Sequence, residues 1–407
     1  MDARLERQLA EIKAAGDPLS LADLTHRPIP PEKNAATYLR QAEPEVTAID
    51  NEIGQWNDKE KIPEFWNYLG GERRPMPEKM HKDMKAIYAA HPKLIVLLQK
   101  AVECPDYDAH LDYSVPPEQL VTQLLAVVQN ARGTARVFAY RTRLLVIDGD
   151  RDEAVRMALA TFRLARHLDR SPLLVSYLVA LAIRGMAVEE ANLALQAGPV
   201  SKEVRQALDG ELAIQERMAG YAWTIKSDRA YGLDEFRSFS LRNFWLYNRG
   251  RWNRQESEYL EVMKAFLALP NNPQPYHAIR SQIGRAYANI LAGSGTFAQQ
   301  IFPALQATND AVMRVQATMQ CLRVLNALQN RVAAGSDKIP AITELGLPAT
   351  TITDPFNGEH LHIKKLPQGW VVYSVGSNER DDGGNLDMHD MANCDFGVGP
   401  PEAAAKK

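Results

Sequence analysis

The chain has 407 residues, of which 45% are hydrophobic and 24% charged, an ordinary composition for a globular protein. This length exceeds what one simple core supports and predicts two or three structural units. The formal net charge of −3 argues against a nucleic-acid-binding protein, because such proteins usually carry a basic excess.

The first predicted region, residues 1–115, is helical. One helix is expected from about Ala3 to Ala15, and a proline-rich connector follows at residues 26–31. A second helix should begin near Asn34, where apolar residues recur at helical spacing. Pro77 opens a third predicted helix, which extends to about Glu103.

Residues 104–115 are expected to form a loop. It contains the oxygen-rich pattern Asp106-x-Asp108-x-His110-x-Asp112. The pattern lacks the Gly and the closing Glu of a calcium-binding EF-hand loop, so turn and capping roles are favoured.

Neither a signal peptide nor a membrane span is visible. The chain opens with alternating charges, which a signal peptide does not have. The apolar run near residues 172–183 is too short to cross a bilayer, and Arg184 closes it. The chain as given is therefore expected to be soluble.

The second region, residues 116–305, is expected to be the helical body. Asp148-Gly149-Asp150 predicts a hairpin tip between antiparallel helices, and Asp150 with Glu153 fits a capping box. Ser171-Pro172 predicts a helix start, Gly198 a helix end, and Ser201 the next cap. Long helices joined by short turns indicate an antiparallel bundle or an irregular solenoid.

Residues 221–254 interleave aromatic side chains with arginines. This pattern could form a stacking surface for a nucleic acid or another ligand. The favoured alternative is an irregular segment whose aromatics anchor it to the helices while its arginines stay in water, given the acidic balance of the chain. Helices are expected to resume at residues 255–267 and 276–291.

The third region, residues 306–407, should contain a long helix and a small β module. The helix is expected at about 304–332, and strands are expected at 361–364 and 370–374. Leu366-Pro367-Gln368-Gly369 is a plausible hairpin connection between the strands. The predicted fold class is thus mainly α, with a small C-terminal antiparallel β module.

Three cysteines, Cys104, Cys321 and Cys394, are far apart in the sequence. They form no Cys-x-x-Cys pair, so neither a zinc site nor a disulfide framework is implied. Reduced, buried thiols are the favoured interpretation, although one long-range disulfide stays open.

His360-x-His362 would place two imidazoles on one face of a strand, since strand side chains alternate. Such a pair can bind zinc or copper only with a further ligand, and His389 is the only nearby histidine. Hydrolase, phosphate-loop and dinucleotide motifs are missing from the sequence. A non-enzymatic protein is therefore predicted, and the alternative is a metal-dependent hydrolase or other enzyme that uses His360, His362 and nearby acids.

Acidic residues concentrate between Ser377 and Asp395. This segment contains six acidic residues and one arginine, which gives a local net charge of −5. Carboxylates this dense repel one another unless a cation neutralises them. A solvated acidic loop without a metal is the alternative.

The C-terminal segment resembles the soluble part of the major pseudopilin of type II secretion systems. The resemblance rests on a helix, Asp354-Pro355-Phe356-x-Gly358, Tyr373-Ser374-x-Gly376 and an acidic Gly-rich loop. It covers about 90 residues, roughly Asn309 to Val398. The chain lacks the long apolar helix with which pseudopilins begin, so a pilus subunit is not expected.

In that family the loop after Ser-x-Gly binds calcium. The resemblance implies that the Val375 carbonyl, Asn378, Asp381, Asp382 and Asp387 supply the ligands. Calcium takes six to eight oxygen ligands from flexible backbone and carboxylates, which suits such a loop. Asn378 departs from the family, which usually has an acid at this position.

The N-terminal pattern around Gly16-Asp17-Pro18 and Pro30-Pro31 resembles a group of bacterial proteins that are usually membrane-anchored. Those proteins carry a helical ectodomain that ends in the same β module. The resemblance implies the soluble portion of a cell-envelope protein, on the periplasmic side, with an anchor absent from this chain. The expected function is non-enzymatic interaction with protein partners and not with nucleic acid.

Overall fold

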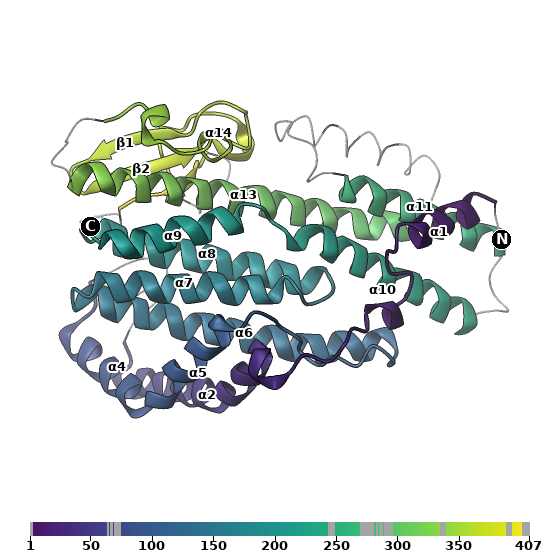
Figure 1. Cartoon of the computed structure of the whole chain (residues 1–407), viewed down its shortest axis with the longest axis horizontal. Coiled ribbons are helices and arrows are strands. Elements are labelled where there is room, and N and C mark those ends of the chain that lie inside the picture. The colour runs from purple at the N-terminus through teal and green to yellow at the C-terminus, as the bar shows by residue number, and fades with distance from the viewer. Residues whose placement is uncertain are drawn as a thin grey trace.

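Long helices stack in layers and carry a small sheet at one end (Figure 1). The computed structural model describes residues 3–62, 65, 68, 75–242, 249–268, 281, 284, 288, 296–333, 339–387 and 393–400. The N-terminal helices are α1 (Ala3–Ala14), α2 (Ala35–Glu60), α4 (Glu78–Ala90) and α5 (Pro92–Glu103), with short 3-10 turns η1 (Leu21–Leu24) and η2 (Pro31–Lys33). The predicted fold class, mainly α with a small antiparallel sheet, is confirmed.

The helical body continues with α6 (Pro117–Ile147), α7 (Arg151–Leu168), α8 (Leu174–Gln196), α9 (Lys202–Gln215), α10 (Gly220–Arg242) and α11 (Arg249–Leu267). The C-terminal part holds α13 (Thr296–Ala333), η4 (Ile342–Leu345), α14 (Ala349–Ile352), η5 (Gly376–Asn378) and strands β1 (His362–Leu366), β2 (Gly369–Ser374) and β3 (Phe396–Val398).

Helix starts that depend on one local side chain lie where the sequence predicts them. The Asp150 carboxylate accepts a hydrogen bond from the Glu153 N–H at 3.2 Å, and the Ser201 hydroxyl accepts one from the Val204 N–H at 3.4 Å. Gly149 has φ +83°, which a residue with a side chain rarely adopts, and it turns the chain between α6 and α7. The predicted hairpin tip is confirmed, although the Glu153 carboxylate pairs with Arg156 instead of completing a capping box.

The helix predicted over residues 77–103 is wrong in one respect, because the chain breaks at His91 into α4 and α5. Pro92 has no N–H and restricts the residue before it, which favours a break at His91. The same restriction does not end every helix, since α2 runs through Pro44 and α13 through Pro303. The break places the His91 ring between two carboxylates of α2, with Nδ1 2.5 Å from Glu45 Oε2 and Nε2 2.9 Å from Glu52 Oε1. The hydrogen bond to Glu45 raises the pKa of His91, and the two contacts to Glu45 and Glu52 tie the start of α5 to α2.

The predicted start of α8 at Ser171-Pro172 is also wrong, because α8 begins at Leu174. Its first N–H groups are satisfied from α10. Leu173 N donates to Ser227 Oγ at 2.9 Å, and Leu174 N donates to Asp228 Oδ1 at 3.2 Å. The predicted end at Gly198 is confirmed, since α8 stops at Gln196.

Residues 221–254 were expected to be irregular, and this expectation is wrong for the described part, which forms α10 and α11. Tyr221 and Phe236 are buried, as predicted. Arg229 is also buried and pairs with Asp17 at 3.0 Å, so the expectation that the arginines stay in water fails there. The predicted helix 276–291 lies largely outside the described residues.

Two large hydrophobic clusters meet at α7. One cluster unites Leu5 with Phe162 of α7, α13 and the sheet residues Val372 and Val398. The other unites α2, α4 and α5 with α6 and with Leu164 of α7. Packing is thus continuous across both boundaries of the three predicted regions, 1–115, 116–305 and 306–407, and that division stays a prediction.

The C-terminal sheet has the order β1-β2-β3 and is antiparallel throughout. The hairpin prediction is confirmed, with Leu366 paired to Gly369, whereas the sequence analysis missed β3. The sheet packs on α13 and is fastened to α8 (Figure 1). Asn192 Nδ2 donates to the Gly399 carbonyl at 2.9 Å, and Gln196 Nε2 donates to the Trp370 carbonyl at 2.7 Å. The module is therefore a cap on the helical body.

The three cysteines are buried free thiols, as predicted. Among the residues that the structure describes, no helix contains a stretch long and apolar enough to span a bilayer.

Candidate functional site

The residues predicted to bind calcium lie in the loop after β2, where the side chains of Asn378, Asp381 and Asp382 already form hydrogen bonds. Val375 N donates to Asp354 at 2.9 Å, and Asn378 Nδ2 donates to Asp382 Oδ2 at 2.8 Å. Asp381 Oδ1 accepts from the Tyr373 hydroxyl at 3.1 Å and from the Gly383 N–H at 2.8 Å. Asp387 donates its backbone N–H to Asn385 Oδ1 at 3.2 Å.

Asp395 closes this loop through its carboxylate. Its oxygens accept from the Asp382 N–H at 3.3 Å and the Gly384 N–H at 2.7 Å. Gly383 and Gly384 both have positive φ, which lets consecutive N–H groups turn towards carboxylates. Burial raises the pKa of Asp395, whereas the Gly383 N–H lowers the pKa of Asp381.

The arrangement described does not bring together three or more His, Cys, Asp or Glu side chains placed to hold one metal ion. This statement covers only the described residues, and 388–392 of the same loop fall outside them. The described side chains therefore do not form a preorganised set of calcium ligands, and the calcium site stays a prediction.

The two sequence elements that carry the pseudopilin resemblance meet in space. Asp354 is fully buried, and its carboxylate accepts from the Phe356 N–H, the Ser374 hydroxyl and the Val375 N–H at 2.8 to 2.9 Å. Burial raises the pKa of Asp354. The Asp-Pro-Phe and Tyr-Ser elements therefore have a structural role, because they join the turn before β1 to the end of β2.

His360 and His362, the candidate metal ligands of the alternative hydrolase, lie in two different environments. His362 begins β1, stacks on Tyr373 with ring centroids 5.0 Å apart, and lies 3.7 Å from Asp381. His360 precedes the strand, in an isolated bridge with Thr353. His389 lies outside the described residues.

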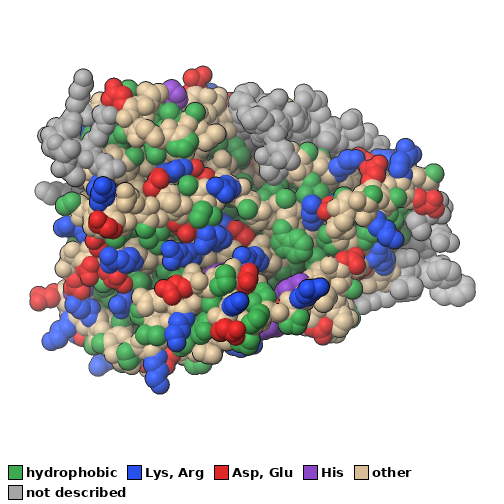
Figure 2. Space-filling view, in the orientation of Figure 1, with side chains coloured by type: hydrophobic (Ala, Val, Ile, Leu, Met, Phe, Trp, Pro, Cys, Tyr) green, Lys and Arg blue, Asp and Glu red, His purple; other side chains and the backbone are tan. Residues whose placement is uncertain are grey.

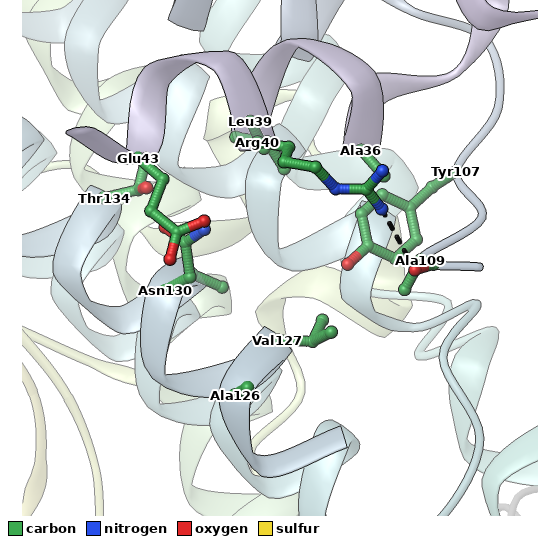
Figure 3. A pocket seen from close by; sticks show the side chains of 11 residues that line it. Ala36, Leu39, Arg40, Glu43, Tyr107, Ala109, Ala126, Val127, Asn130 and Thr134 are labelled. Carbon is green, nitrogen blue, oxygen red and sulfur yellow. Dashed lines mark hydrogen bonds between the residues drawn. The ribbon is translucent and has the colours of Figure 1, made fainter. Parts of the chain in front are cut away.

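A cavity of about 140 Å³ opens between α2 and α6, and the sequence analysis did not anticipate it (Figure 3). The lining includes Ala36 of α2 and Ala126 and Ala131 of α6, whose short side chains fill little of the space. Leu39 and Val127 supply further apolar lining. Small side chains on both helices therefore leave room for the cavity.

Polar groups lie around this apolar space. Arg40 and Glu43 are exposed on successive turns of α2, and Asn130 and the buried Thr134 lie on α6. Figure 3 shows the Glu43 carboxylate near Asn130 and the Arg40 guanidinium at the opposite end, beside Ala109. Arg40 Nη2 donates to the Ala109 carbonyl at 3.5 Å, a long hydrogen bond. The cavity thus offers a cation and an anion at separate ends.

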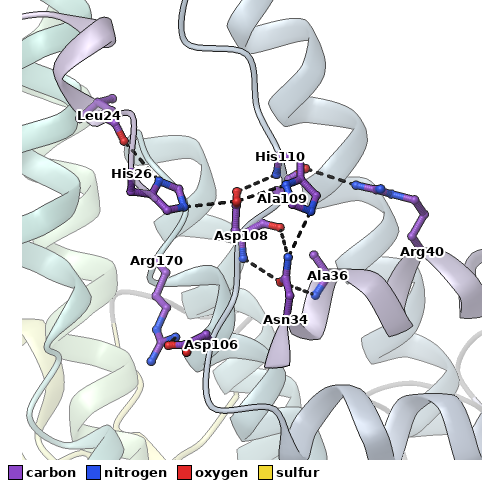
Figure 4. Close-up of polar contacts among 10 residues, drawn as sticks. All are labelled: Leu24, His26, Asn34, Ala36, Arg40, Asp106, Asp108, Ala109, His110 and Arg170. Carbon is purple, nitrogen blue, oxygen red and sulfur yellow. Dashed lines mark hydrogen bonds and ion pairs between the residues drawn. The ribbon is translucent and has the colours of Figure 1, made fainter. Parts of the chain in front are cut away.

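The loop that ends the cavity is fixed to α2 by Asn34 (Figure 4). The Asn34 side chain is fully buried, and its Oδ1 accepts from the Ala36 N–H at 3.1 Å and the Asp108 N–H at 2.9 Å. Its Nδ2 donates to the Asp108 carbonyl at 2.9 Å. One side chain therefore caps α2 and holds the loop residues that wall the cavity.

Side chains of the Asp106–Asp112 pattern complete this frame, in the predicted turn role. Asp108 Oδ1 accepts from the His110 N–H at 2.7 Å, while Oδ2 lies 3.4 Å from His26 and 3.2 Å from His110 (Figure 4). Asp106 pairs with Arg170 at 2.8 Å. The buried Tyr107 ring, which lines the cavity, stacks on His167 at 5.9 Å.

Ionisable groups are also buried deep in the helical body, away from this cavity. Arg184 is 1% exposed, forms an ion pair with Asp169, and donates from Nε to Gln215 Oε1 at 2.8 Å. Glu190 is 5% exposed and accepts from the hydroxyls of Thr161 at 3.0 Å and Thr142 at 3.3 Å. Burial raises the pKa of Glu190 to about 8.

Acidic and basic side chains are interspersed over the face shown in Figure 2. This arrangement differs from the continuous basic surface that is typical of nucleic-acid binders.

Comparison with known proteins gives no match to a family model, to a curated protein or to a solved structure.

Proposed function

We propose that this chain is a non-enzymatic binding protein of the cell envelope, with its recognition site in the cavity between α2 and α6. The observation that carries the proposal is the lining of that cavity. Arg40, Glu43 and Asn130 offer charge and hydrogen bonds around apolar walls, which is the pattern of a small-ligand site. The envelope location and additional protein partners are motivated by the sequence resemblance.

In this proposal the C-terminal β module closes the helical body and takes no part in chemistry. Its support is the pair of hydrogen bonds from Asn192 and Gln196 of α8 to the module, together with the shared hydrophobic core. A calcium ion bound in the acidic loop would neutralise carboxylates there and stabilise the cap.

The binding function is tested by blocking the cavity. A panel of small amines, carboxylates, zwitterions and neutral amides is screened against the purified chain by saturation-transfer NMR. Ala126 is an exposed residue of the lining, so Ala126→Trp should cover the open side of the cavity and abolish the signal of any panel member that binds there. The neighbouring Leu125, which is 43% exposed and does not line the cavity, provides the matched control Leu125→Trp.

Ligands that bind wild type and Leu125→Trp but not Ala126→Trp would support the proposal. A panel with no such member would contradict it, provided that thermal melts show both variants folded.

The calcium prediction is tested by thermal melts of metal-stripped protein in calcium and in chelator. Calcium at a hundredfold excess over its dissociation constant should stabilise the folded state by about 2.7 kcal/mol, because only the folded loop binds it. Asp382→Ala should reduce this shift, whereas Glu359→Ala, an acid outside the loop, should not. Magnesium should substitute poorly, because it needs a tighter octahedron. Identical melts with calcium and chelator would rule the site out.

A further inference from the structure

The cavity between α2 and α6 opens to solvent beside the exposed Arg40, Glu43 and Ala126, and its size limits the part of a ligand that enters it. Its volume of about 140 Å³ is close to the roughly 150 Å³ of an engineered protein cavity that accommodates benzene. A nucleotide or a disaccharide is much larger than this space. The ligand is therefore expected to have about as many heavy atoms as one amino acid.

The walls determine which part of the ligand enters. Leu39, Ala131 and Tyr107, which are 8%, 5% and 6% exposed, supply part of the apolar lining, beside the polar side chains of Arg40, Glu43, Asn130 and Thr134. The Tyr107 ring is supported from behind by His167. An aliphatic group is the chemistry that gains most by leaving water for such a site.

The charges around the cavity determine the other part of the ligand. Arg40 and Glu43 are three residues apart on α2, a spacing that places their Cβ atoms about 5–6 Å apart. Within the part of the chain that the structure describes, neither side chain forms an ion pair, and they point to opposite ends of the cavity (Figure 3). One cation and one anion are thus available to a single small ligand.

From these three features we propose that the cavity binds a free α-amino acid with an aliphatic side chain of about the size of valine or leucine. The inference rests on the proposed function and names its ligand class. The Arg40 guanidinium pairs with the α-carboxylate, which it can contact through two N–H groups. Glu43 pairs with the α-ammonium, and Asn130 lies beside Glu43 as a further hydrogen-bonding group. The side chain enters between Leu39 and Val127.

Calorimetric titration of the full chain with leucine and two analogues separates the charge contributions. N-acetyl-leucine keeps the carboxylate and lacks the ammonium, and leucinamide keeps the ammonium and lacks the carboxylate. Leucine should bind at one site per chain, and each analogue should bind at least tenfold more weakly. Aspartate, which adds a charge to the part that enters the cavity, should not bind measurably.

Variants test the assigned partners. Arg40→Gln should weaken leucine at least tenfold and leave leucinamide unchanged, while Glu43→Gln should weaken leucine and leave N-acetyl-leucine unchanged. Arg132→Gln removes an exposed charge from α6 outside the cavity lining and should leave all affinities unchanged. Ala126→Trp should abolish leucine binding, and Leu125→Trp should preserve it.

The outcomes distinguish this inference from the function on which it rests. If an analogue binds as tightly as leucine and Ala126→Trp abolishes its binding, the zwitterion assignment is wrong but the cavity is still a binding site. If leucine binds equally to wild type and Ala126→Trp, the cavity is not its site. If neither leucine nor any member of the small-molecule panel binds, both proposals are overturned.

Discussion

Replacing Glu190 by Gln is expected to raise the free energy of unfolding by about 3 kcal/mol at pH 7. In the folded protein burial raises the pKa of Glu190 to about 8 from the ordinary value of 4.5, so the carboxyl stays protonated at pH 7. In the unfolded chain the same group is ionised, and folding must therefore take up a proton. This contribution opposes folding increasingly as pH rises from about 4.5 to about 8. A Gln side chain accepts the same two threonine hydroxyls and does not titrate.

Urea unfolding of wild type and Glu190→Gln between pH 4 and 9 measures the effect. The two proteins should have nearly equal stability at pH 4 and diverge as pH rises. Glu189→Gln changes the exposed neighbour on the same helix and should not reproduce the divergence. A stability difference between wild type and Glu190→Gln that is the same at every pH would show that Glu190 does not fold as the neutral acid.

Asp169→Ala is expected to lower the free energy of unfolding by about 3–5 kcal/mol. The substitution leaves the Arg184 guanidinium, 1% exposed, without the carboxylate that balances its charge. Gln215 continues to accept from Arg184 Nε but supplies no negative charge. The loss comes mainly from a buried, uncompensated cation and not from the missing hydrogen bond.

The double variant Asp169→Leu/Arg184→Met tests this explanation. It removes both charges at similar volume, so its loss should be only about 1–3 kcal/mol, from the Gln215 oxygen left without its partner. Glu11→Ala breaks the Lys264–Glu11 pair, whose side chains are 71% and 56% exposed, and should cost no more than about 0.5 kcal/mol. A double variant less stable than Asp169→Ala would contradict the charge argument.

The sequence predicts those elements of the fold that depend on neighbouring residues. Asp150 and Ser201 cap helices with their own side chains a few residues from the N–H groups that they accept, so a short pattern reveals them. The start of α8 is different, because its first N–H, that of Leu174, donates to Asp228, which lies 54 positions away. Pro92 marks the break between α4 and α5, whereas α2 and α13 run through Pro44 and Pro303, so a proline alone does not locate a helix end.

The sequence also does not show which charged residues are buried, because burial depends on contacts between distant segments. Arg184 ends an apolar run, and the same pattern would arise if it faced water. Its partner Asp169 is the C-cap residue of α7, whereas Arg184 lies in α8, so only tertiary packing shows that the two meet. Strand β3 is three residues long, too short for a recognisable alternation, and it depends on pairing with β2.

The cavity could not be predicted for a further physical reason. Alanines such as Ala36 and Ala126 are common in helices, and nothing in their spacing shows that they face each other across a gap. Asn34 was recognised only as the approximate start of a helix, whereas its hold on Asp108 appears once the loop is placed. The predicted calcium ligands stay untested, because their family resemblance supplies an order of residues and not a coordination geometry.

The cluster that joins Leu5 to Val398 has a consequence for folding during synthesis. At about 5–20 residues per second, translation of these 407 residues takes on the order of 20–80 s, and β3 is the last of the described elements to be made. The cluster around α2, α5 and α6 draws on residues 35–183 and can close while the ribosome is still making the rest. The buried faces of α1, α8 and α13 must wait for the final strand. We therefore expect the nascent chain to expose apolar surface for most of its synthesis, the period in which a chaperone would be needed.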